Sequence, residues 1–227
     1  MSSLPTDLRL LRLLQLASPA LPVGSYAYSQ GLEWAVAAGW VDGEPALEHW
    51  LAEQLTCGIG GVDLPILSRL YEAAVRHDDE QLRLWSRQLT AMRETRELAA
   101  DDGDRGRALA RLLRDLAIAP AVVWVEREDV PLATLTAIAA VEWGLPLVST
   151  AQAYAWSWLE NQVLAGVKLI PLGQVAGQRL LLRLTPAIPR VCERALALED
   201  DEIGGTLPIV ALASSLHETQ YTRLFRS

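Results

Sequence analysis

The sequence has few residues that bind metals or form cross-links. Two cysteines, Cys57 and Cys192, and three histidines, His49, His77 and His217, are scattered along 227 residues. No two of them have the spacing of a zinc site, and two isolated cysteines are too few for a disulfide framework. We therefore expect no structural metal site and no cofactor, and we assign neither catalytic nor metal-ligating residues.

Lysine and the usual catalytic motifs are also scarce. Lys168 is the single lysine and Val167 precedes it, which excludes the G-x-x-x-x-G-K-[ST] phosphate loop. A G-x-S-x-G elbow is missing too. The net charge of −8 argues against nonspecific binding to nucleic acid or to an anionic membrane. Residues 1–13 lack a basic region followed by an unbroken apolar run, so we expect no secretory signal and a cytoplasmic location.

Apolar residues make up 51% of the chain, and in 147–170 they recur at steps of three and four. This is the period of a buried helical stripe. A second stripe with Val148, Trp156 and Leu164 leaves little polar circumference. Glu160 and Lys168 argue against a membrane span, because each ionised side chain at mid-bilayer costs roughly 2.5–3.5 kcal/mol. The pattern predicts the central helix of an all-α domain.

Proline, glycine and capping residues divide the rest of the chain into further helices. We expect them at 8–16, 25–39 with Ser25 as cap, 46–57, 63–77, 80–92, 131–143, 178–198 and 208–217. GIGG (58–61) is expected to be flexible, and 116–131 to be loop and helix ends. The predicted fold is an all-α, single-domain bundle of about eight to ten helices over 1–198, followed by 199–227 as linker and flexible C-terminal tail.

Six arginines and six acids are interleaved between Arg93 and Asp115. Three pairs of opposite charge have i,i+4 spacing: Arg93–Glu97, Asp101–Arg105 and Arg111–Asp115. We interpret this run as a solvated helix face, broken near Gly103 and Gly106.

Two polar groups are candidates for binding another protein. Tyr26, Ser29, Gln30 and Glu33 would share one face of the helix 25–39; the alternative is a solvent-facing helix with a half-buried tyrosine. Near the end of the chain, Tyr221, Leu224 and Phe225 are flanked by Arg223 and Arg226. Such a tail can pack on its own domain, move freely, or fold into a partner's groove.

Four motifs resemble the F-type urease accessory proteins and span nearly the whole chain. They are ASPALPVGSYAYSQGLE (17–33), RETREL (93–98), PLGQVAGQ (171–178) and HETQYTRLFRS (217–227). The resemblance implies an all-helical homodimer without an active site of its own. It implies a protein that bridges the D/H-type accessory protein and the G-type GTPase in the complex that inserts nickel into apo-urease. Two alternatives are a GTPase-activating protein that acts directly on the G-type GTPase, and a generic helical scaffold or small-molecule binder.

The resemblance also assigns roles to single residues. The tail residues Tyr221, Arg223, Leu224 and Phe225, with His217 and Glu218, would dock on partners, and the group around Tyr26 would contribute to the same surface. Lys168 is a candidate contact for regulating the GTPase; its alternative role is a charge that extends to solvent from a helix end. Gln152 and Trp156 are the candidate dimer contact. One departure is Leu216, which stands where family members often carry a basic residue.

Overall fold

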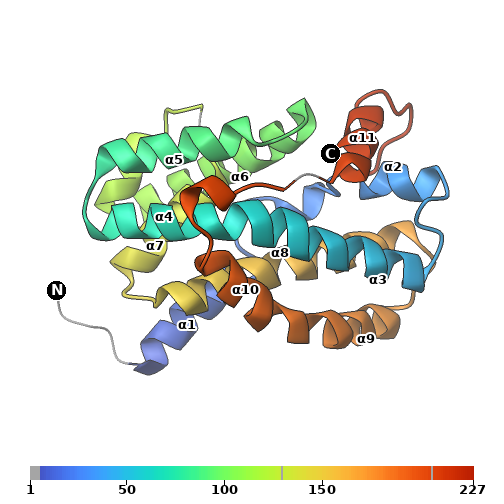
Figure 1. The fold of residues 1–227 in the computed structure, drawn as a ribbon, viewed down its shortest axis with the longest axis horizontal. Helices are drawn as coiled ribbons and strands as arrows, with labels where there is room; N and C mark the ends of the chain where they lie inside the picture. Colours follow the sequence, from blue (N-terminus) through green and yellow to red (C-terminus); the bar gives the residue numbers. More distant parts are fainter. Residues whose placement is uncertain (1–5, 129, 206) are drawn as a thin grey trace.

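The computed structural model describes residues 6–128, 130–205 and 207–227, and over these ranges the regular elements are helices (Figure 1). The α-helices are α1 (Thr6–Ala17), α2 (Leu32–Ala37), α3 (Glu44–Glu53), α4 (Leu64–Val75), α5 (Asp79–Ala91), α6 (Arg96–Asp115), α7 (Leu132–Glu142), α8 (Leu147–Leu169), α9 (Gln174–Leu184), α10 (Ile188–Leu196) and α11 (Pro208–His217). Short 3₁₀ turns are η1 (Ser25–Ala27), η3 (Ala119–Trp124), η4 (Thr185–Ala187) and η5 (Asp200–Glu202), and η2 (Gln54–Asp63) is a π-helix. The expected all-α, single-domain fold is confirmed.

The central helix α8 has the predicted limits. It begins after Pro146, ends before Pro171, and packs against α1, α9, α10 and α4. Its buried face includes Ala151, Ala155 and Leu159, as the apolar period predicted. None of the helices in the described ranges is long and apolar enough to cross a membrane.

The helices α3 and α4 are joined through η2 into one continuous helix, which crosses the front of the molecule in Figure 1. The expectation of a flexible GIGG segment is therefore wrong. A Cβ at Gly60 would lie 2.7 Å from Val191 Cγ1, and one at Gly61 would lie 2.7 Å from the carbonyl oxygen of Gly204. The glycines are required because α10 and the chain after η5 approach this helix closely, not because the segment bends.

The predicted helix 25–39 is also wrong. Only η1 and α2 are helical there, with no side-chain cap from Ser25, because the chain turns through Gln30 (φ 54°) and Gly31 (φ 83°). The left-handed region is costly for a residue with a side chain. A Cβ at Gly31 would lie 2.8 Å from the backbone nitrogen of Ser214, so α11 fills the space beside this turn.

Helix α6 is unbroken, against expectation, although Gly103 and Gly106 lie inside it. A Cβ at Gly106 would lie 1.7 Å from the carbonyl oxygen of Val130. This glycine therefore permits the segment before α7 to pass against the helix. The expected helix 178–198 is instead divided into α9, η4 and α10, and Pro186 lies in the intervening turn.

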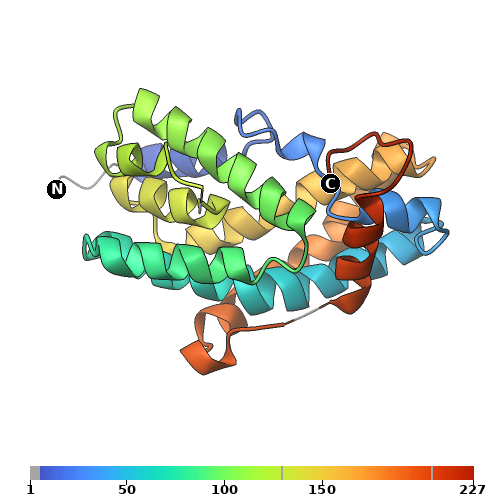
Figure 2. The same ribbon diagram turned by 90° about the horizontal axis from the view of Figure 1, so that it is seen from above.

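The chain beyond residue 199 folds back on the bundle. α11 has the predicted limits and packs against α2, and the C-terminus lies close to both helices (Figure 2). Of the three arrangements considered for the tail, the structure shows the first, in which it packs on its own domain, and the expected flexible tail is docked.

Candidate functional site

Residues 218–227, here called the C-terminal segment, are held by residues 27–33, here called the clamp. The carbonyl oxygen of Ser227 accepts hydrogen bonds from the backbone N–H groups of Ser29 (2.5 Å) and Gln30 (3.1 Å). The Ser29 hydroxyl donates to the same oxygen at 2.7 Å. The N–H of Arg226 donates to the carbonyl oxygen of Ala27 at 2.8 Å. The reversal at Gln30 and Gly31 thus turns the clamp's N–H groups toward the C-terminal segment.

Glu33 is the buried side chain on which both parts converge. Its Oε1 accepts the N–H of Leu224 at 2.6 Å, and its Oε2 accepts the N–H of Phe225 at 2.9 Å. The same Oε2 lies 3.1 Å from Nε2 of His217. One carboxylate in the first turn of α2 therefore orders the C-terminal segment and contacts the end of α11.

His217 is fully buried (0% exposed) between two carboxylates. Its Nδ1 lies 2.7 Å from Oε2 of Glu97 in α6, and Nη1 of Arg223 donates to the other oxygen of Glu97 at 2.8 Å. The two carboxylates lie against opposite ring nitrogens and so cannot converge on one ion. Within the described part of the chain, no group of three or more His, Cys, Asp or Glu is arranged to hold a metal ion.

The residues predicted at 26–33 do not share one helix face. Tyr26 is 67% exposed, whereas Ser29 and Glu33 are buried and Gln30 is half-buried. Both interpretations of this stretch as a regular helix are wrong, because the turn at Gln30 and Gly31 separates η1 from α2. The structure does bring three of these residues, Ser29, Gln30 and Glu33, against the C-terminal segment.

The C-terminal segment divides into inward and outward side chains. Phe225 is 6% exposed, whereas Leu224 is 66% exposed and Tyr221 is fully exposed. Just before it, α11 exposes Ile209, Leu212 and Leu216, which share one helix face by their spacing. Glu218, which is half-buried, pairs with the exposed Arg96 at 3.5 Å.

Lys168, near the end of α8, contacts the C-terminal segment. Its ammonium lies 5.6 Å from the centre of the Phe225 ring, within the range of a cation–π contact. Gln152 and Trp156 are half-buried and lie one turn apart on α8, and Trp156 packs against the core. Since a helix rises about 1.5 Å per residue, they lie roughly 18–24 Å from Lys168 along the axis.

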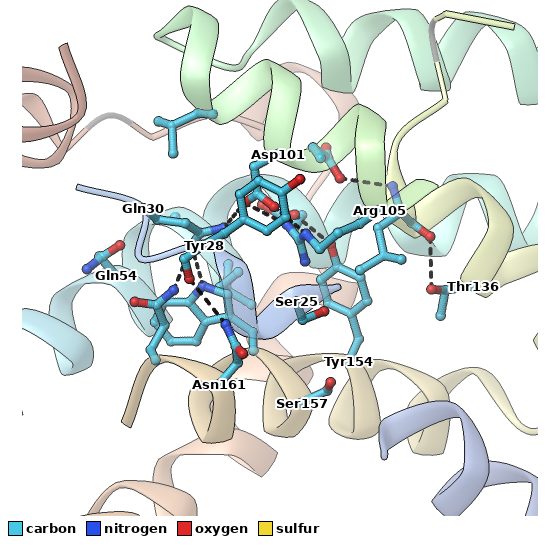
Figure 3. Close-up of a pocket in the computed structure, with 18 of the residues that line it drawn as sticks. Ser25, Tyr28, Gln30, Gln54, Asp101, Arg105, Thr136, Tyr154, Ser157 and Asn161 are labelled. Atoms are coloured by element: carbon cyan, nitrogen blue, oxygen red, sulfur yellow. Dashed lines mark hydrogen bonds and ion pairs between the residues drawn. The ribbon is translucent and has the colours of Figure 1, made fainter. Parts of the chain in front are cut away.

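A cavity of about 140 Å³, lined by both apolar and polar side chains, lies behind the clamp, between α6, α8 and η2 (Figure 3). Gln30 of the clamp reaches into it: its amide nitrogen donates to Asp101 at 2.7 Å, and its amide oxygen accepts the indole N–H of Trp158 at 2.9 Å. Arg105 pairs with Asp101 through two hydrogen bonds of 2.5 and 3.0 Å. The clamp therefore has one side on the C-terminal segment and the other on this cavity.

Arg93 also lines the cavity. It donates two hydrogen bonds to Asp63, at 2.7 and 3.0 Å, and two to Asp102, at 2.7 and 2.8 Å. The hydroxyl of Tyr154 donates to Asp63 at 2.9 Å. The prediction that the run 93–115 forms a solvated face is therefore wrong on the side of α6 that faces the bundle. Of the three predicted pairs, Asp101–Arg105 is present, Arg93 pairs with Asp63 and Asp102, and Asp115 pairs with Arg114.

Burial sets the protonation of the groups around the cavity. Burial works against the charge of Arg93, but the carboxylates of Asp102 and Asp63 outweigh it and raise its pKa well above the ordinary value. Burial raises the pKa of Tyr154 well above its ordinary value, and Asp63 and Asp102 add to this effect. Arg93 therefore stays cationic and Tyr154 stays a phenol, which is the behaviour of a structural ion network. Sequence spacing gave no signal for it, because Asp63 lies 30 positions from Arg93 and 91 from Tyr154.

Comparison with known proteins agrees with the earlier resemblance. The UreF family model matches residues 41–185. The chain is 52% identical over 216 residues to the urease accessory protein UreF of Alkalilimnicola ehrlichii, covering 95% of each chain. The chain belongs to the UreF family. It is also 51% identical to the UreF protein of a Pseudomonas putida strain, over 98% of this chain and 99% of that one. The UreF of Hahella chejuensis is 45% identical over 97% of this chain and 99% of its own. The clamp and the C-terminal segment lie outside the range of the family model.

Proposed function

We propose that this UreF-family protein is a urease maturation factor. It bridges the D/H-type accessory protein and the G-type GTPase in the complex that inserts nickel into apo-urease. It works as a homodimer in the cytoplasm and breaks no bond itself. Support comes from relatives of nearly the same length that are named urease accessory proteins. Nickel is cargo of the complex here, not a resident ion of this chain.

The observation that carries the proposal is the division of the C-terminal segment into a held side and a free side. The clamp and Glu33 fix the backbone at Leu224 to Ser227. The same contacts leave the side chains of Tyr221 and Leu224 in solvent. A segment that is already ordered loses less conformational entropy when it binds than a free tail does.

The exposed side chains indicate what the D/H-type partner presents. Tyr221 and Leu224 offer apolar surface, and Arg223 is still 39% exposed while it donates to Glu97. Aromatic residues and arginine are the common anchors of protein interfaces. The proposal therefore requires an apolar groove on the partner with at least one carboxylate at its rim.

A capture experiment with the D/H-type protein tests this surface. Leu224→Asp should abolish or strongly weaken capture, because it places a charge at an apolar contact without removing a buried group. The matched control is Leu182→Asp on α9, where the leucine is 76% exposed. Deletion should start at Glu218, because His217 is part of the core. Equal capture by wild type and Leu224→Asp would refute the surface.

Bridging requires a second partner, and Lys168 is the candidate contact for the GTPase. Its ammonium lies over Phe225, so the two proposed contact regions adjoin. Lys168→Met keeps the length of the side chain and removes the charge. We expect it to weaken recruitment of the GTPase to the preformed complex while capture of the D/H-type protein is retained. Loss of both interactions, or of neither, would contradict separate roles.

The alternative function is direct activation of the GTPase. The observation in its favour is that the C-terminal segment carries two arginines, Arg223 and Arg226, at an exposed surface. An arginine donated to a nucleotide site can raise the rate by roughly 10³–10⁵. GTP turnover by the G-type protein, with and without this chain, decides between the two functions. A change within about twofold would remove the activator.

A further inference from the structure

We infer that the cavity behind the clamp is a binding site for a small, uncharged, mainly apolar molecule that carries one hydrogen-bond donor. The inference rests on the size of the cavity, on its apolar wall and on one buried acceptor that lacks a donor. It goes beyond the proposed function and does not depend on which proteins the chain assembles with.

The cavity has room for a molecule of about the size of one six-membered ring. Its volume is about 140 Å³, and an apolar cavity of roughly 150 Å³ in another protein binds benzene. The apolar part of the wall comes from α1, the loop after it, η2 and α6, and includes Leu16, Leu21, Val23, Ile59, Val62 and Leu109. The contribution of η2 supports a ligand site, because π-helical stretches are frequent at functional sites. These side chains favour a ligand with an apolar body.

The charged groups of the wall already bind one another. Both carboxylate oxygens of Asp63 accept hydrogen bonds, from Arg93 and Tyr154. Both oxygens of Asp101 accept hydrogen bonds from Arg105. A cation therefore finds no oxygen on these two aspartates that lacks a donor. The ion pairs of the wall contain three aspartates and two arginines, so their charges sum to −1 and disfavour an anion. Both arguments favour an uncharged ligand.

Gln162 in α8 is the polar group of the wall that remains open. Its side chain is 1% exposed, and its amide nitrogen donates to Oε1 of Gln30 at 3.3 Å. Its amide oxygen is buried and has no donor among the described residues. The neighbour fixes the orientation of this amide: Gln30 donates to Asp101 and accepts the indole N–H of Trp158, so its oxygen faces the nitrogen of Gln162. A buried acceptor without a donor is costly, and a ligand that donates one hydrogen bond removes that cost.

The cavity reaches solvent beside the loop between α1 and η1. Pro19 lines the cavity and is exposed, and Ser18 and Ser25 line it and are half-buried. Ser157 in α8, labelled in Figure 3, is also half-buried. The ligand therefore enters beside this loop and not through the packed core helices.

Phenol tests the site on the full chain, and toluene is the probe of similar size that lacks the donor. In NMR titrations, phenol should shift the indole N–H signal of Trp158 and the side-chain amide signals of Gln30 and Gln162 until the site is saturated. Benzoate and benzylammonium, which are charged, should shift these signals far less. No saturable shift with phenol would mean that the cavity holds water only, and would overturn the site. A charged probe that binds as tightly as phenol would overturn the class of ligand.

Gln162→Leu removes the open acceptor and nearly keeps the size of the side chain. The affinity for phenol relative to toluene should fall on the order of tenfold, which is the usual value of one hydrogen bond. Gln178→Leu, at an exposed position of α9, is the matched control and should keep the wild-type ratio. An unchanged ratio in Gln162→Leu would contradict the role of the buried acceptor.

Ser157→Leu keeps the test decisive if Gln162→Leu folds poorly. The larger side chain fills part of the cavity from a half-buried position and leaves the amides of Gln30 and Gln162 in place. Phenol binding should be lost while circular dichroism shows the native helix content. Phenol that still binds this folded variant with wild-type affinity would lie elsewhere, and the inference would be wrong.

Discussion

The hydroxyl of Ser29 donates to the carbonyl oxygen of Ser227 at 2.7 Å, although the two residues are 198 positions apart. The same hydroxyl oxygen accepts the N–H of Glu33 at 3.2 Å. Ser29 therefore ties the C-terminal segment to the start of α2. Through its bond to the backbone of Glu33, it also helps to position the residue that contacts Leu224 and Phe225.

Ser29→Ala removes both hydroxyl contacts and leaves the backbone bonds. We expect a loss of about 1 kcal/mol in the free energy of unfolding, the usual value of a buried hydrogen bond. Amide exchange at residues 224–227 should accelerate more than exchange in α8. Thr222→Ala, at an exposed position of the same segment, is the control and should change neither quantity.

The clamp shows where sequence reasoning reached its limit. Spacing placed Ser29, Gln30 and Glu33 on a helix, because nothing local to the sequence reveals a left-handed residue at position 30. That conformation depends on contacts with α11 and with Ser227, which are remote in the chain. In contrast, the limits of α8 and α11 were predicted well, because Pro146, Pro171 and Pro208 act on their immediate neighbours.

Arg93→Met should destabilise the protein by about 3–5 kcal/mol, because the buried carboxylates of Asp63 and Asp102 would lose the cation that pairs with them. Denaturant unfolding measures the loss. Arg76→Met breaks an exposed pair with Glu72 and should cost less than about 0.5 kcal/mol.

Sequence spacing alone could not show that the charged run 93–115 faces the bundle. An i,i+4 pair on α6 looks the same in the sequence whether its face meets solvent or the bundle. Arg93 precedes α6, and its acceptor Asp63 ends η2, so their contact depends on how two helices pack. Of the three predicted pairs, only Asp101–Arg105, which is local to α6, is among the ion pairs of the described residues.

Gly106→Ala and Gly103→Ala form a matched pair within α6. At Gly106 the new Cβ would meet the carbonyl oxygen of Val130 at 1.7 Å, so the backbone must shift, at about 1–3 kcal/mol or more. At Gly103 it would meet Nη1 of Arg107 at 3.2 Å, the end of a flexible side chain. Gly103→Ala should therefore approach the helical gain of alanine over glycine, up to about 1 kcal/mol. Equal unfolding free energies for the two variants would contradict the close approach.

Cys192 offers a test of burial through pH. Burial raises the pKa of its thiol to about 11, whereas Cys57 is half-buried. In a Cys57→Ser variant, alkylation of the folded chain at pH 8 should be slow and should rise about tenfold per pH unit, because the thiolate reacts. An unfolded thiol titrates near about 8.5. The contribution of the buried Cys192 thiol to the free energy of unfolding is therefore fully present below that pH, and it is lost as the pH rises toward 11. Rapid alkylation at pH 8 without unfolding would contradict the packing of α10.

Trp156→Asp tests the proposed dimer contact on α8. If Trp156 and Gln152 meet a second copy, the aspartate would bury an unpaired charge at the interface, and light scattering after size exclusion should show monomers. Because Trp156 also packs against the core, the loss of a dimer counts only if circular dichroism shows the native helix content. Gln152→Arg provides the second variant, since it adds a charge beside Trp156 and removes no core contact. Leu182→Asp on α9 should leave the mass unchanged, and a dimer that persists in both α8 variants would rule out this face.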